Sequence, residues 1–403
     1  MFGVTQRAYK YRFYPNEQQR QLLNRTFGCV RYVYNRALSE RTAAWTNEHR
    51  RITYGQTSAM LTEWKSEPSV EWLNEVSCVP LQQTLRHLQK AFVAFWGRQS
   101  GYPRFKSRRR GKASAEFTRS GFRYRDGKLW LAKCQDPLRI VWSRPLPDGA
   151  EPSTVTVSRD RAGRWFVSML VEDAAIGDLP KLQAAIGIDV GLTALVTLST
   201  GEKIINPKFE KADRARLARA QRALSRKQIG SRNREKARIR MAKTSVRIAD
   251  RRRDFAHKLT TRLVRENQTI VIEDLAVRNM RGSHRLARAI SDAAWSQLRI
   301  MLEYKCRWYG RRLVIVDRWL PSSKTCGACG AIAESMPLSS REWTCHSCNT
   351  NHDRDINAAR NILAAGLAVA ACGDDVRPQR RQSGGQLSVK QENRPEKVGV
   401  PCR

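Results

Sequence analysis

The sequence is poor in acidic residues, which number 37 among 403 residues against 74 lysines and arginines. The resulting formal net charge of +37 opposes a compact fold unless a polyanion neutralises it, and nucleic acid is the first candidate for that partner. The competing interpretation is an anionic membrane surface. Hydrophobic residues still make up 41% of the chain, so a packed core is expected and overall disorder is excluded.

Long apolar stretches are also lacking. No run of apolar residues is long enough to span a bilayer, and no basic segment followed by an apolar one marks a signal peptide. These absences predict a cytosolic protein without a membrane partner, and its length predicts two or three domains. In a reducing compartment, the ten cysteines favour metal binding or free thiols over disulfides.

The N-terminal part is expected to form a strand followed by a helical bundle. TQRAYKYRFYP alternates polar and apolar residues, which predicts a strand that ends near Pro15. Two later stretches, NEQQRQLLNRTFGCVRYVYNRAL and VPLQQTLRHLQKAFVAFW, repeat their apolar residues at helical spacing. We therefore expect a helical bundle over residues 15–105.

The following residues have the alternation of a β-rich unit. FRYRDGKLWLA places Asp126 and Gly127 between two alternating segments, which is a strong signal for a two-residue hairpin turn. VTVSRDRAGRWFVSMLV predicts a second hairpin with a longer turn. Together these strands predict an antiparallel β-barrel made of residues 1–14 and 106–180, with the helical bundle inserted in it.

The second half of the chain predicts an α/β domain. Three short strands are expected in AIGIDVGLTALVTLSTGEKIINP, and a charged helical hairpin follows with a break near Gly230. Further strands are expected in TIVIEDL and LVIVDRW, with one helix, ISDAAWSQLRIMLEYKCRWYG, between them and a last helix in DINAARNILAAGLAVA. The predicted layout is an α/β domain over 181–320 and 352–376, an insert over 321–351, and a disordered polar tail over 377–403.

Four cysteines of the insert have the spacing of a metal site. Cys326 and Cys329 lie in KTCGACG, and Cys345 and Cys348 lie in WTCHSC. A C-x2-C-x15-C-x2-C pattern places two thiolates on each of two tight turns and predicts one tetrahedral Zn²⁺. Because four thiolates fill the tetrahedron, this zinc is expected to be structural. His346 and His352 are possible competing ligands.

Three carboxylates stand where acidic side chains are costly. Asp189 ends the apolar AIGID, Glu273 lies inside TIVIEDL, and Asp355 begins the last helix. Each has an ordinary explanation when taken alone, namely a strand end, an ion pair of Glu273 or Asp274 with an arginine, and a helix N-cap. Together they suit two Mg²⁺ ions, which can activate water and hold the leaving oxygen in phosphodiester hydrolysis.

The motifs GIDVG, VIEDL and HDRDINAARN resemble the three-part catalytic pattern of RuvC-like nucleases. Over nearly the whole chain, YRFYPNEQQ, GYPRFKSR, EDLAVRNMRGSHRLARAISDAAWSQLRIMLEYK, SSKTCGACG and ACGDDVRP resemble TnpB, the transposon-encoded RNA-guided nuclease family related to type V CRISPR effectors. The resemblance implies an N-terminal β-barrel, or wedge domain, with an inserted helical recognition bundle. It also implies a RuvC-like (RNase H-like) nuclease domain that carries a zinc-ribbon insert.

The resemblance further implies a Mg²⁺-dependent endonuclease that uses a guide RNA from the transposon end to cut double-stranded DNA beside a short adjacent motif. The expected form is a monomer on one RNA, in the cytoplasm of a prokaryotic cell and associated with the nucleoid. The family's catalytic residues, which also hold the two Mg²⁺ ions, carry over onto Asp189, Glu273 and Asp355. Asp353 is the alternative to Asp355, which is preferred because it directly precedes the helix.

Two basic segments are predicted to contact nucleic acid. The loop 101–112 mixes basic residues with Tyr102 and Phe105, which suits structured RNA, while the helical hairpin 208–265 suits the backbone of a guide–target duplex. The alternatives are core packing for the two aromatic residues and a solvated face for the hairpin. The predicted contact residues are Arg104, Lys106, Arg108, Arg109 and Arg110 in the loop and Arg226, Lys227 and Arg238 in the hairpin.

Several other functions compete with this one. An RNA-guided DNA-binding repressor predicts the loss of at least one carboxylate, and all three are present. A single-strand transposase needs a tyrosine nucleophile beside a histidine pair, and the six histidines of the chain form no such cluster. A junction resolvase of the same fold needs neither the bundle, the barrel nor the zinc insert. An unguided RuvC-type nuclease is the alternative if bound RNA proves nonspecific.

Overall fold

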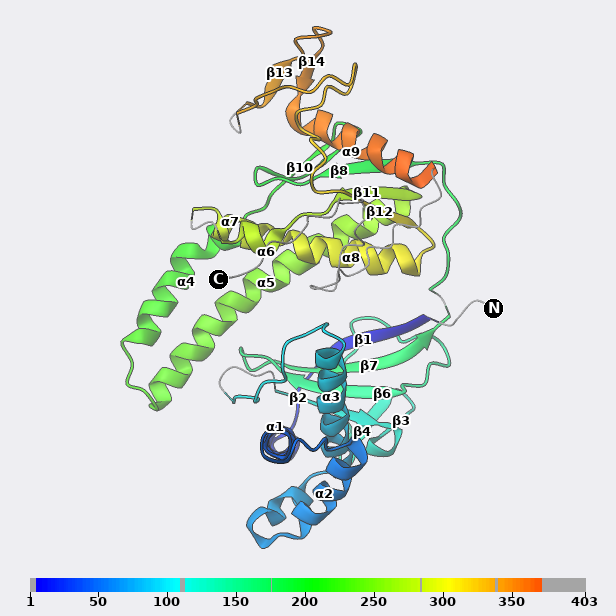
Figure 1. The fold of residues 1–403 in the computed structure, drawn as a ribbon. Helices are drawn as coiled ribbons and strands as arrows, with labels where there is room; N and C mark the ends of the chain where they lie inside the picture. The colour runs from blue at the N-terminus through cyan, green and yellow to red at the C-terminus, as the bar shows by residue number, and fades with distance from the viewer. Residues whose placement is uncertain (1–4, 109–112, 175, 283–284, 338–339, 372–403) are drawn as a thin grey trace, which may run out of the picture.

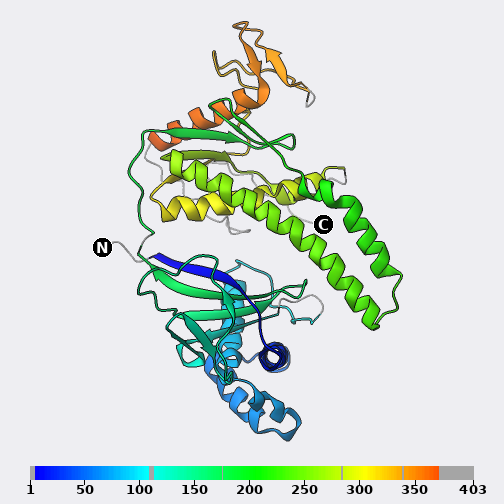
Figure 2. The ribbon, with the colours of Figure 1, turned by 180° about the vertical axis from the view of Figure 1, so that it is seen from behind.

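The structure is a computed structural model that describes residues 5–108, 113–174, 176–282, 285–337 and 340–371. Each half of the chain is organised around one β-sheet, and Figures 1 and 2 show the two halves one above the other in both views. The predicted tail over 377–403 lies outside the described residues. No helix among the described residues is both long and apolar enough to cross a membrane.

The sheet of the first half is antiparallel throughout, in the order β2-β6-β7-β1-β5. Strand β1 pairs with β7 along its whole length, so the two ends of this half meet in the middle of the sheet. No bond between β2 and β5 is recorded within the described part of the chain, and closure into a barrel stays a prediction. The strands are β1 (Thr5–Phe13), β2 (Ala113–Thr118), β5 (Ile140–Val141), β6 (Thr154–Arg159) and β7 (Trp165–Asp173).

A separate two-stranded hairpin, β3 (Phe122–Arg125) and β4 (Lys128–Leu131), confirms the turn expected at Asp126 and Gly127. Both turn residues have positive φ angles, 49° and 69°, as a two-residue hairpin turn of this kind requires.

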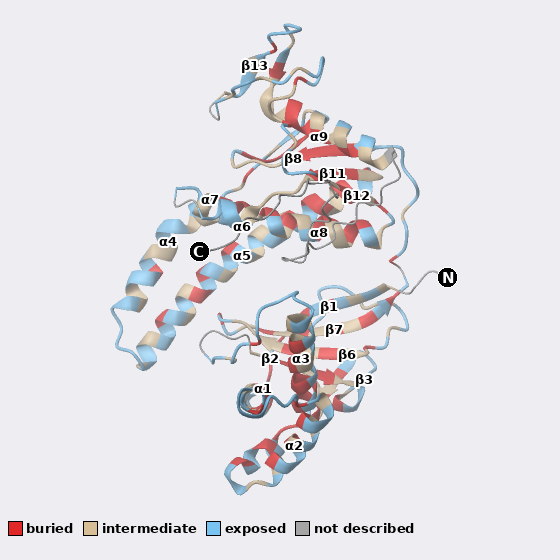
Figure 3. Ribbon diagram, in the orientation of Figure 1, coloured by how far each residue is buried: buried red, intermediate tan, exposed pale blue. Residues whose placement is uncertain are grey.

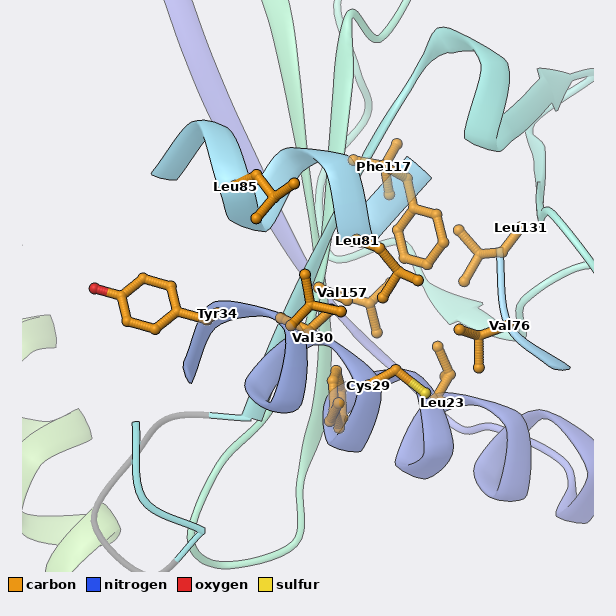
Figure 4. Close-up of a cluster of buried hydrophobic side chains, with 14 of the residues drawn as sticks. Leu23, Cys29, Val30, Tyr34, Val76, Leu81, Leu85, Phe117, Leu131 and Val157 are labelled. Carbon is orange, nitrogen blue, oxygen red and sulfur yellow. The ribbon is translucent and has the colours of Figure 1, made fainter. Parts of the chain in front are cut away.

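All helical elements of the first half except one short 3-10 turn, which follows β2, lie between β1 and β2 in the sequence. Asn16 and Gln19 form a capping box at the start of α1, which then continues well beyond the apolar stripe seen in the sequence. Figure 4 shows side chains of α1 and α3, such as Leu23, Val30 and Leu81, meeting Val157 of the sheet in one apolar core. The elements are α1 (Glu17–Glu48), α2 (Tyr54–Ser66), the 3-10 segment Pro68–Glu75, α3 (Cys78–Trp96) and the 3-10 turn Arg119–Gly121.

The second sheet has the order β10-β9-β8-β11-β12, with β8, β11 and β12 parallel and the other pairs antiparallel. Successive side chains of a strand point to opposite faces, so Ile270 and Ile272 pack on the side of α5 and α8 while Val271 packs against α9. Figure 3 shows the buried residues of β8 and β11 between α9 on one side and α8 on the other. The strands are β8 (Ala185–Asp189), β9 (Ala194–Leu198), β10 (Lys203–Ile205), β11 (Thr269–Glu273) and β12 (Arg312–Val316).

The helical hairpin expected in this half is formed by α4 (Phe209–Ser225) and α5 (Arg232–Glu266), with Gly230 at a φ of 89° in the turn. It is joined to the first half by an ion pair of 2.6 Å between Arg164 and Asp250. The remaining helices are α6 (Val277–Met280), α7 (Ala287–Ala293), α8 (Trp295–Trp308) and α9 (Arg354–Ala371).

One sequence expectation about this half is wrong. ISDAAWSQLRIMLEYKCRWYG was expected to be one helix, but α7 ends and α8 begins at Ala294, which has a left-handed φ of 55°. The carboxylate of Asp292, at the end of α7, accepts hydrogen bonds from the backbone of Glu210 at the start of α4 and from Arg252. These contacts anchor the end of α7 to α4 and α5 directly before the break.

Candidate active site and metal centre

Strands β8 and β11 bring two carboxylates to the same edge of the second sheet. In the parallel ladder Ile188 pairs with Ile272, and the next residue of each strand is an acid, Asp189 in one and Glu273 in the other. Residues in register on adjacent parallel strands project to the same side. Asp189 and Glu273 therefore lie beside each other where both strands end.

Helix α9 brings the third carboxylate to this edge because two glycines allow it to lie directly on the sheet. A Cβ on Gly187 would lie 2.1 Å from the carbonyl oxygen of Ala359, and one on Gly366 would lie 2.3 Å from Cγ1 of Val271. Asp355 is one helical turn before Ala359. That turn places Asp355 close enough for its charge to act on Asp189.

The electrostatics of the three groups are those of a cation site. Burial, followed by the charges of Glu273 and Asp355, raises the pKa of Asp189 to about 8. Burial also raises the pKa of Glu273, while a hydrogen bond from the Ser322 hydroxyl opposes that rise. Carboxylates that disfavour each other's ionisation attract a proton or a metal ion. Their hard oxygen ligands fit Mg²⁺.

The neighbouring Asp353 has a different role from Asp355. Its Oδ1 accepts hydrogen bonds from the backbone N–H groups of Asp355 (3.1 Å) and Ile356 (3.0 Å), and its Oδ2 pairs with Lys203. Asp353 is therefore the residue that caps α9, and the N-cap explanation of Asp355 is wrong. The carboxylate of Asp355 lies in the first turn, 3.6 Å from Nη1 of Arg341.

Sequence reasoning missed the polar residues that support this edge. The Ser322 hydroxyl donates to Oε1 of Glu273 at 2.6 Å, and Asn361 donates to the carbonyl of Ser322 at 2.8 Å. Asn357 donates to the carbonyl of Thr325 at 2.7 Å and accepts from the backbone N–H of Gly327. Two asparagines four residues apart share a helix face, and that spacing in NAARN was the available signal.

The four predicted cysteines do come together. Their sulfur atoms all lie within 4.8 Å of one another, with 3.6 Å from Cys326 to Cys348 and 3.7 Å from Cys329 to Cys345. Four thiolates around one Zn²⁺ at ~2.3 Å have sulfur–sulfur distances of ~3.8 Å, so the cluster fits a single zinc ion. The short strands β13 (Glu342–Thr344) and β14 (Asn351–Asp353) form the hairpin beyond the start of α9 in Figure 1.

His352 lies against this cluster rather than replacing one of its members. Its Nε2 is 3.0 Å from Sγ of Cys326, and its ring packs on Trp343 with centroids 5.0 Å apart. A group in this position supports a metal-bound thiolate by hydrogen bonding.

The predicted nucleic-acid contacts lie in two segments that approach each other at Glu235, whose pKa is lowered first by its hydrogen bond with Arg238 and also by the charge of Arg108. Arg104, Arg108, Arg226 and Lys227 are exposed, and Arg238 is exposed but paired with Glu235. Lys106 instead turns inward, with Nζ 4.0 Å from the ring centroid of Tyr34 and 3.3 Å from Oγ1 of Thr84, and burial lowers its pKa. Arg109 and Arg110 lie outside the described residues. The contacts of all eight residues with nucleic acid stay predictions.

Three family models match parts of the chain. Residues 167–284 match a family described as "Probable transposase", residues 295–362 match "Cas12f1-like, TNB domain", and residues 1–50 match "Helix-turn-helix domain". Within residues 1–50, the described part of the chain contains β1 and the single long helix α1. The second range spans the cysteine cluster and the start of α9.

Two curated relatives cover nearly the whole chain. A protein from Streptomyces pristinaespiralis named "Putative RNA-guided DNA endonuclease" is 63% identical over 402 residues, which is 100% of both chains. "Putative RNA-guided DNA endonuclease InsQ" of Escherichia coli (strain K12) is 33% identical over 398 residues, covering 93% of this chain and 95% of its own.

Two solved structures share the fold. In the "Cas12f1-sgRNA-target DNA complex" the TM-score is 0.54 at 13% identity, covering 89% of this chain and 98% of the other. In the "mini-RNA-guided endonuclease CRISPR-Cas_phi3" it is 0.52 at 8% identity, covering 91% and 93%. The chain therefore has a Cas12-like fold with mixed α/β sheets.

Proposed function

Because the chain belongs to the TnpB family, we propose that it is an RNA-guided endonuclease that cuts double-stranded DNA beside a short adjacent motif. Its guide is an RNA made from the transposon end, and one chain acts on one RNA. The observation that carries the enzymatic part is the meeting of Asp189, Glu273 and Asp355 at one edge of the second sheet, with the pKa of Asp189 raised to about 8. A non-enzymatic repressor would have no use for this costly cluster.

Asp189, Glu273 and Asp355 are the residues that would hold two Mg²⁺ ions. Ions bound there supply an activated water and a stabilised leaving oxygen for phosphodiester hydrolysis. The chain itself supplies pre-organisation. Ser322 fixes Glu273 by its hydrogen bond, and the cap made by Asp353 fixes the first turn of α9 and with it Asp355.

The four cysteines would hold one structural Zn²⁺, which closes the module carried between β12 and α9. The segment that leads into this module is bonded to α9 by Asn357 and Asn361 and to β11 through Ser322. We propose that the module rests over the carboxylates and helps to guide a DNA strand to them. Its short path back to Asp355 explains why the acidic turn follows the last cysteine pair so closely.

Expression of the chain from its gene with the flanking DNA, followed by purification of the protein and sequencing of the RNA bound to it, tests this function. The proposal predicts one discrete RNA whose end matches the flank of an empty insertion site. That RNA should direct Mg²⁺-dependent cleavage of a matching plasmid, and Asp189→Ala should abolish cleavage while keeping the RNA. Guided binding without cleavage would support the repressor, and cleavage without a matching RNA would support the unguided nuclease.

A further inference from the structure

Two tryptophans stand at the carboxyl ends of two helices of the first half, with one arginine between them. Trp45 lies in the last turn of α1 and Trp96 is the last residue of α3, and their exposed fractions are 48% and 45%. The guanidinium carbon of Arg51 lies 5.7 Å from the ring centroid of Trp45 and 5.6 Å from that of Trp96. We call these three residues the tryptophan platform.

The indole of Trp96 is supported by packed side chains of α3, α1 and the loop after α3. Trp96 packs on Phe92 with centroids 5.6 Å apart, and Phe92 in turn meets Tyr102 at 5.6 Å and the buried guanidinium of Arg41 at 4.2 Å. The hydroxyl of Tyr102 is hydrogen-bonded to that of Thr42 on α1. These contacts hold the exposed indole of Trp96 in place, which lowers the entropy that would be lost when a ligand orders it.

The fold does not need these two indoles for its core. The apolar core of the first half contains Phe92 but neither Trp45 nor Trp96. Exposed tryptophans that gather at one place are typical of a binding surface. Arg51, Arg98 and Arg104, near the two tryptophans in the sequence, are exposed and form no ion pair with any residue that the structure describes, whereas the acidic Glu48 is paired with Arg50.

We propose that the tryptophan platform binds unpaired bases of a single-stranded RNA. Base–aromatic stacking is sequence-tolerant, and it combines with arginine contacts to phosphates in proteins that hold single strands. Arg51 already lies against the indole rings and can exchange that contact for a phosphate. The net charge of +37 on the chain is complementary to the RNA backbone and unsuited to a second, equally basic copy of the chain.

The choice of RNA as occupant rests on the proposed function, because a guide RNA stays on the protein while target DNA comes and goes. The platform belongs to the lower half in Figure 1, whereas the carboxylates lie in the upper half, so the strand held here is not required to be the strand that is cut. A DNA single strand is the alternative occupant that the experiment distinguishes.

Photo-crosslinking with the purified full chain tests the site without any cleavage. A short single-stranded RNA carrying iodouridine is irradiated on the protein at raised salt, where phosphate contacts weaken and stacking persists. We expect crosslinks on the peptides that hold Trp45 and Trp96 and none above background on Trp72, a 38% exposed tryptophan of the same half packed on Tyr32. Crosslinks absent from Trp45 and Trp96, or equal at Trp72, would overturn the proposal. Stronger crosslinking of the matching DNA strand would overturn the assignment to RNA.

Affinity measurements supply the second readout. The double variant Trp45→Ala/Trp96→Ala should bind the single-stranded RNA about tenfold or more weakly, because each stacked base contributes ~1–3 kcal/mol. Trp45→Phe/Trp96→Phe should stay within about threefold of wild type because it keeps both aromatic faces. Duplex RNA, held by its phosphates, should bind all variants alike. If the alanine variant lost as much affinity for duplex RNA as for single-stranded RNA, stacking would be contradicted. The same holds if the phenylalanine variant lost as much affinity as the alanine variant. Failure of plasmid cleavage with the crosslinks present would reject the proposed function alone.

Discussion

The side chain of Ser322 donates a hydrogen bond of 2.6 Å to Oε1 of Glu273, and no regular element of the second sheet contains that serine. It belongs to the segment that leads from β12 into the cysteine cluster, and Asn361 of α9 donates to its carbonyl. Hydrogen bonds thus connect β11, the segment after β12 and α9 at the edge where the carboxylates meet.

Ser322→Ala should lower the cleavage rate about tenfold and raise the Mg²⁺ concentration needed for half-maximal rate, because loss of a group that orients a metal ligand typically costs 10–100-fold. Ser322→Thr keeps the hydroxyl and should keep most of the rate. Initial rates measured over a Mg²⁺ series check this, with Ser323→Ala as the matched control. Equal rates in the Ser322→Ala variant and wild type would show that Glu273 needs no such partner.

Removal of the carboxylate should affect cleavage at Asp355 and stability at Asp353. Asp355→Ala should abolish cleavage while leaving folding and RNA binding intact. Asp353→Ala removes the cap of α9, so it should lower the free energy of unfolding by about 1 kcal/mol and leave substantial cleavage. Denaturant unfolding and plasmid cleavage on both variants decide the matter. Cleavage that survives in the Asp355→Ala variant but not in the Asp353→Ala variant would reverse our assignment.

The raised pKa of Asp189 predicts a pH-dependent stability in the absence of divalent metal. Its folded value of about 8 exceeds the unfolded value of ~3.9, so the folded state keeps a proton that the unfolded state releases. The retained proton stabilises the folded state. This contribution to the free energy of unfolding is complete below about pH 4 and is lost as the pH rises through about 8.

Asp189→Asn cannot ionise, so in EDTA its melting temperature should rise relative to wild type as the pH increases from about 5 to about 9. Mg²⁺ should raise the melting temperature of wild type at about pH 8 more than that of the variant. A difference between the two proteins that stays constant with pH would contradict the shared site.

Zinc content should depend on the cysteine cluster and not on cysteines in general. Cys329→Ser should lose the bound zinc and lower the melting temperature, because three thiolates hold the ion more weakly than four. Cys78→Ser, at another exposed cysteine that is not part of the cluster, should keep one zinc per chain. Elemental analysis of both variants provides the measurement. Full zinc content in the Cys329→Ser variant would exclude this residue as a ligand.

Gly187→Ala tests the close approach of α9 to β8. The added methyl would overlap the carbonyl of Ala359, so we expect a loss of about 1–3 kcal/mol in unfolding free energy and a larger loss of cleavage as Asp355 shifts. Gly28→Ala is the control, because a Cβ there meets nothing within 4 Å and alanine favours the helix. Equal melting temperatures of the Gly187→Ala and Gly28→Ala variants would show that α9 can move away from β8 without loss of stability.

Local chemistry explains what the sequence could predict. Asp126-Gly127 specifies its own turn, and the charged helical pattern on both sides of the break at Gly230 specifies two helices. Asp189 and Glu273 could be singled out because an acid next to an apolar strand is unusual. The cysteine spacing predicted the cluster for the same local reason.

Tertiary contacts decided what the sequence could not predict. The break at Ala294 depends on Asp292 reaching α4, far away in the chain. Lys106 turns inward because Tyr34 and Thr84 offer it a site there. The choice between Asp353 and Asp355 needed the cap geometry, and the roles of Ser322, Asn357 and Asn361 exist only once the segment before the cysteines lies on α9.

The most direct test of the central claim is to replace the guide portion of the bound RNA and follow where the DNA is cut. Two plasmids that share the adjacent motif but differ in the matched sequence are offered to the same purified protein. Our account predicts that the cut moves to whichever plasmid matches the new guide, requires Mg²⁺, and disappears in the Asp189→Ala variant. A cut that stays on the original plasmid, or that persists in that variant, would contradict RNA-guided cleavage at the three carboxylates.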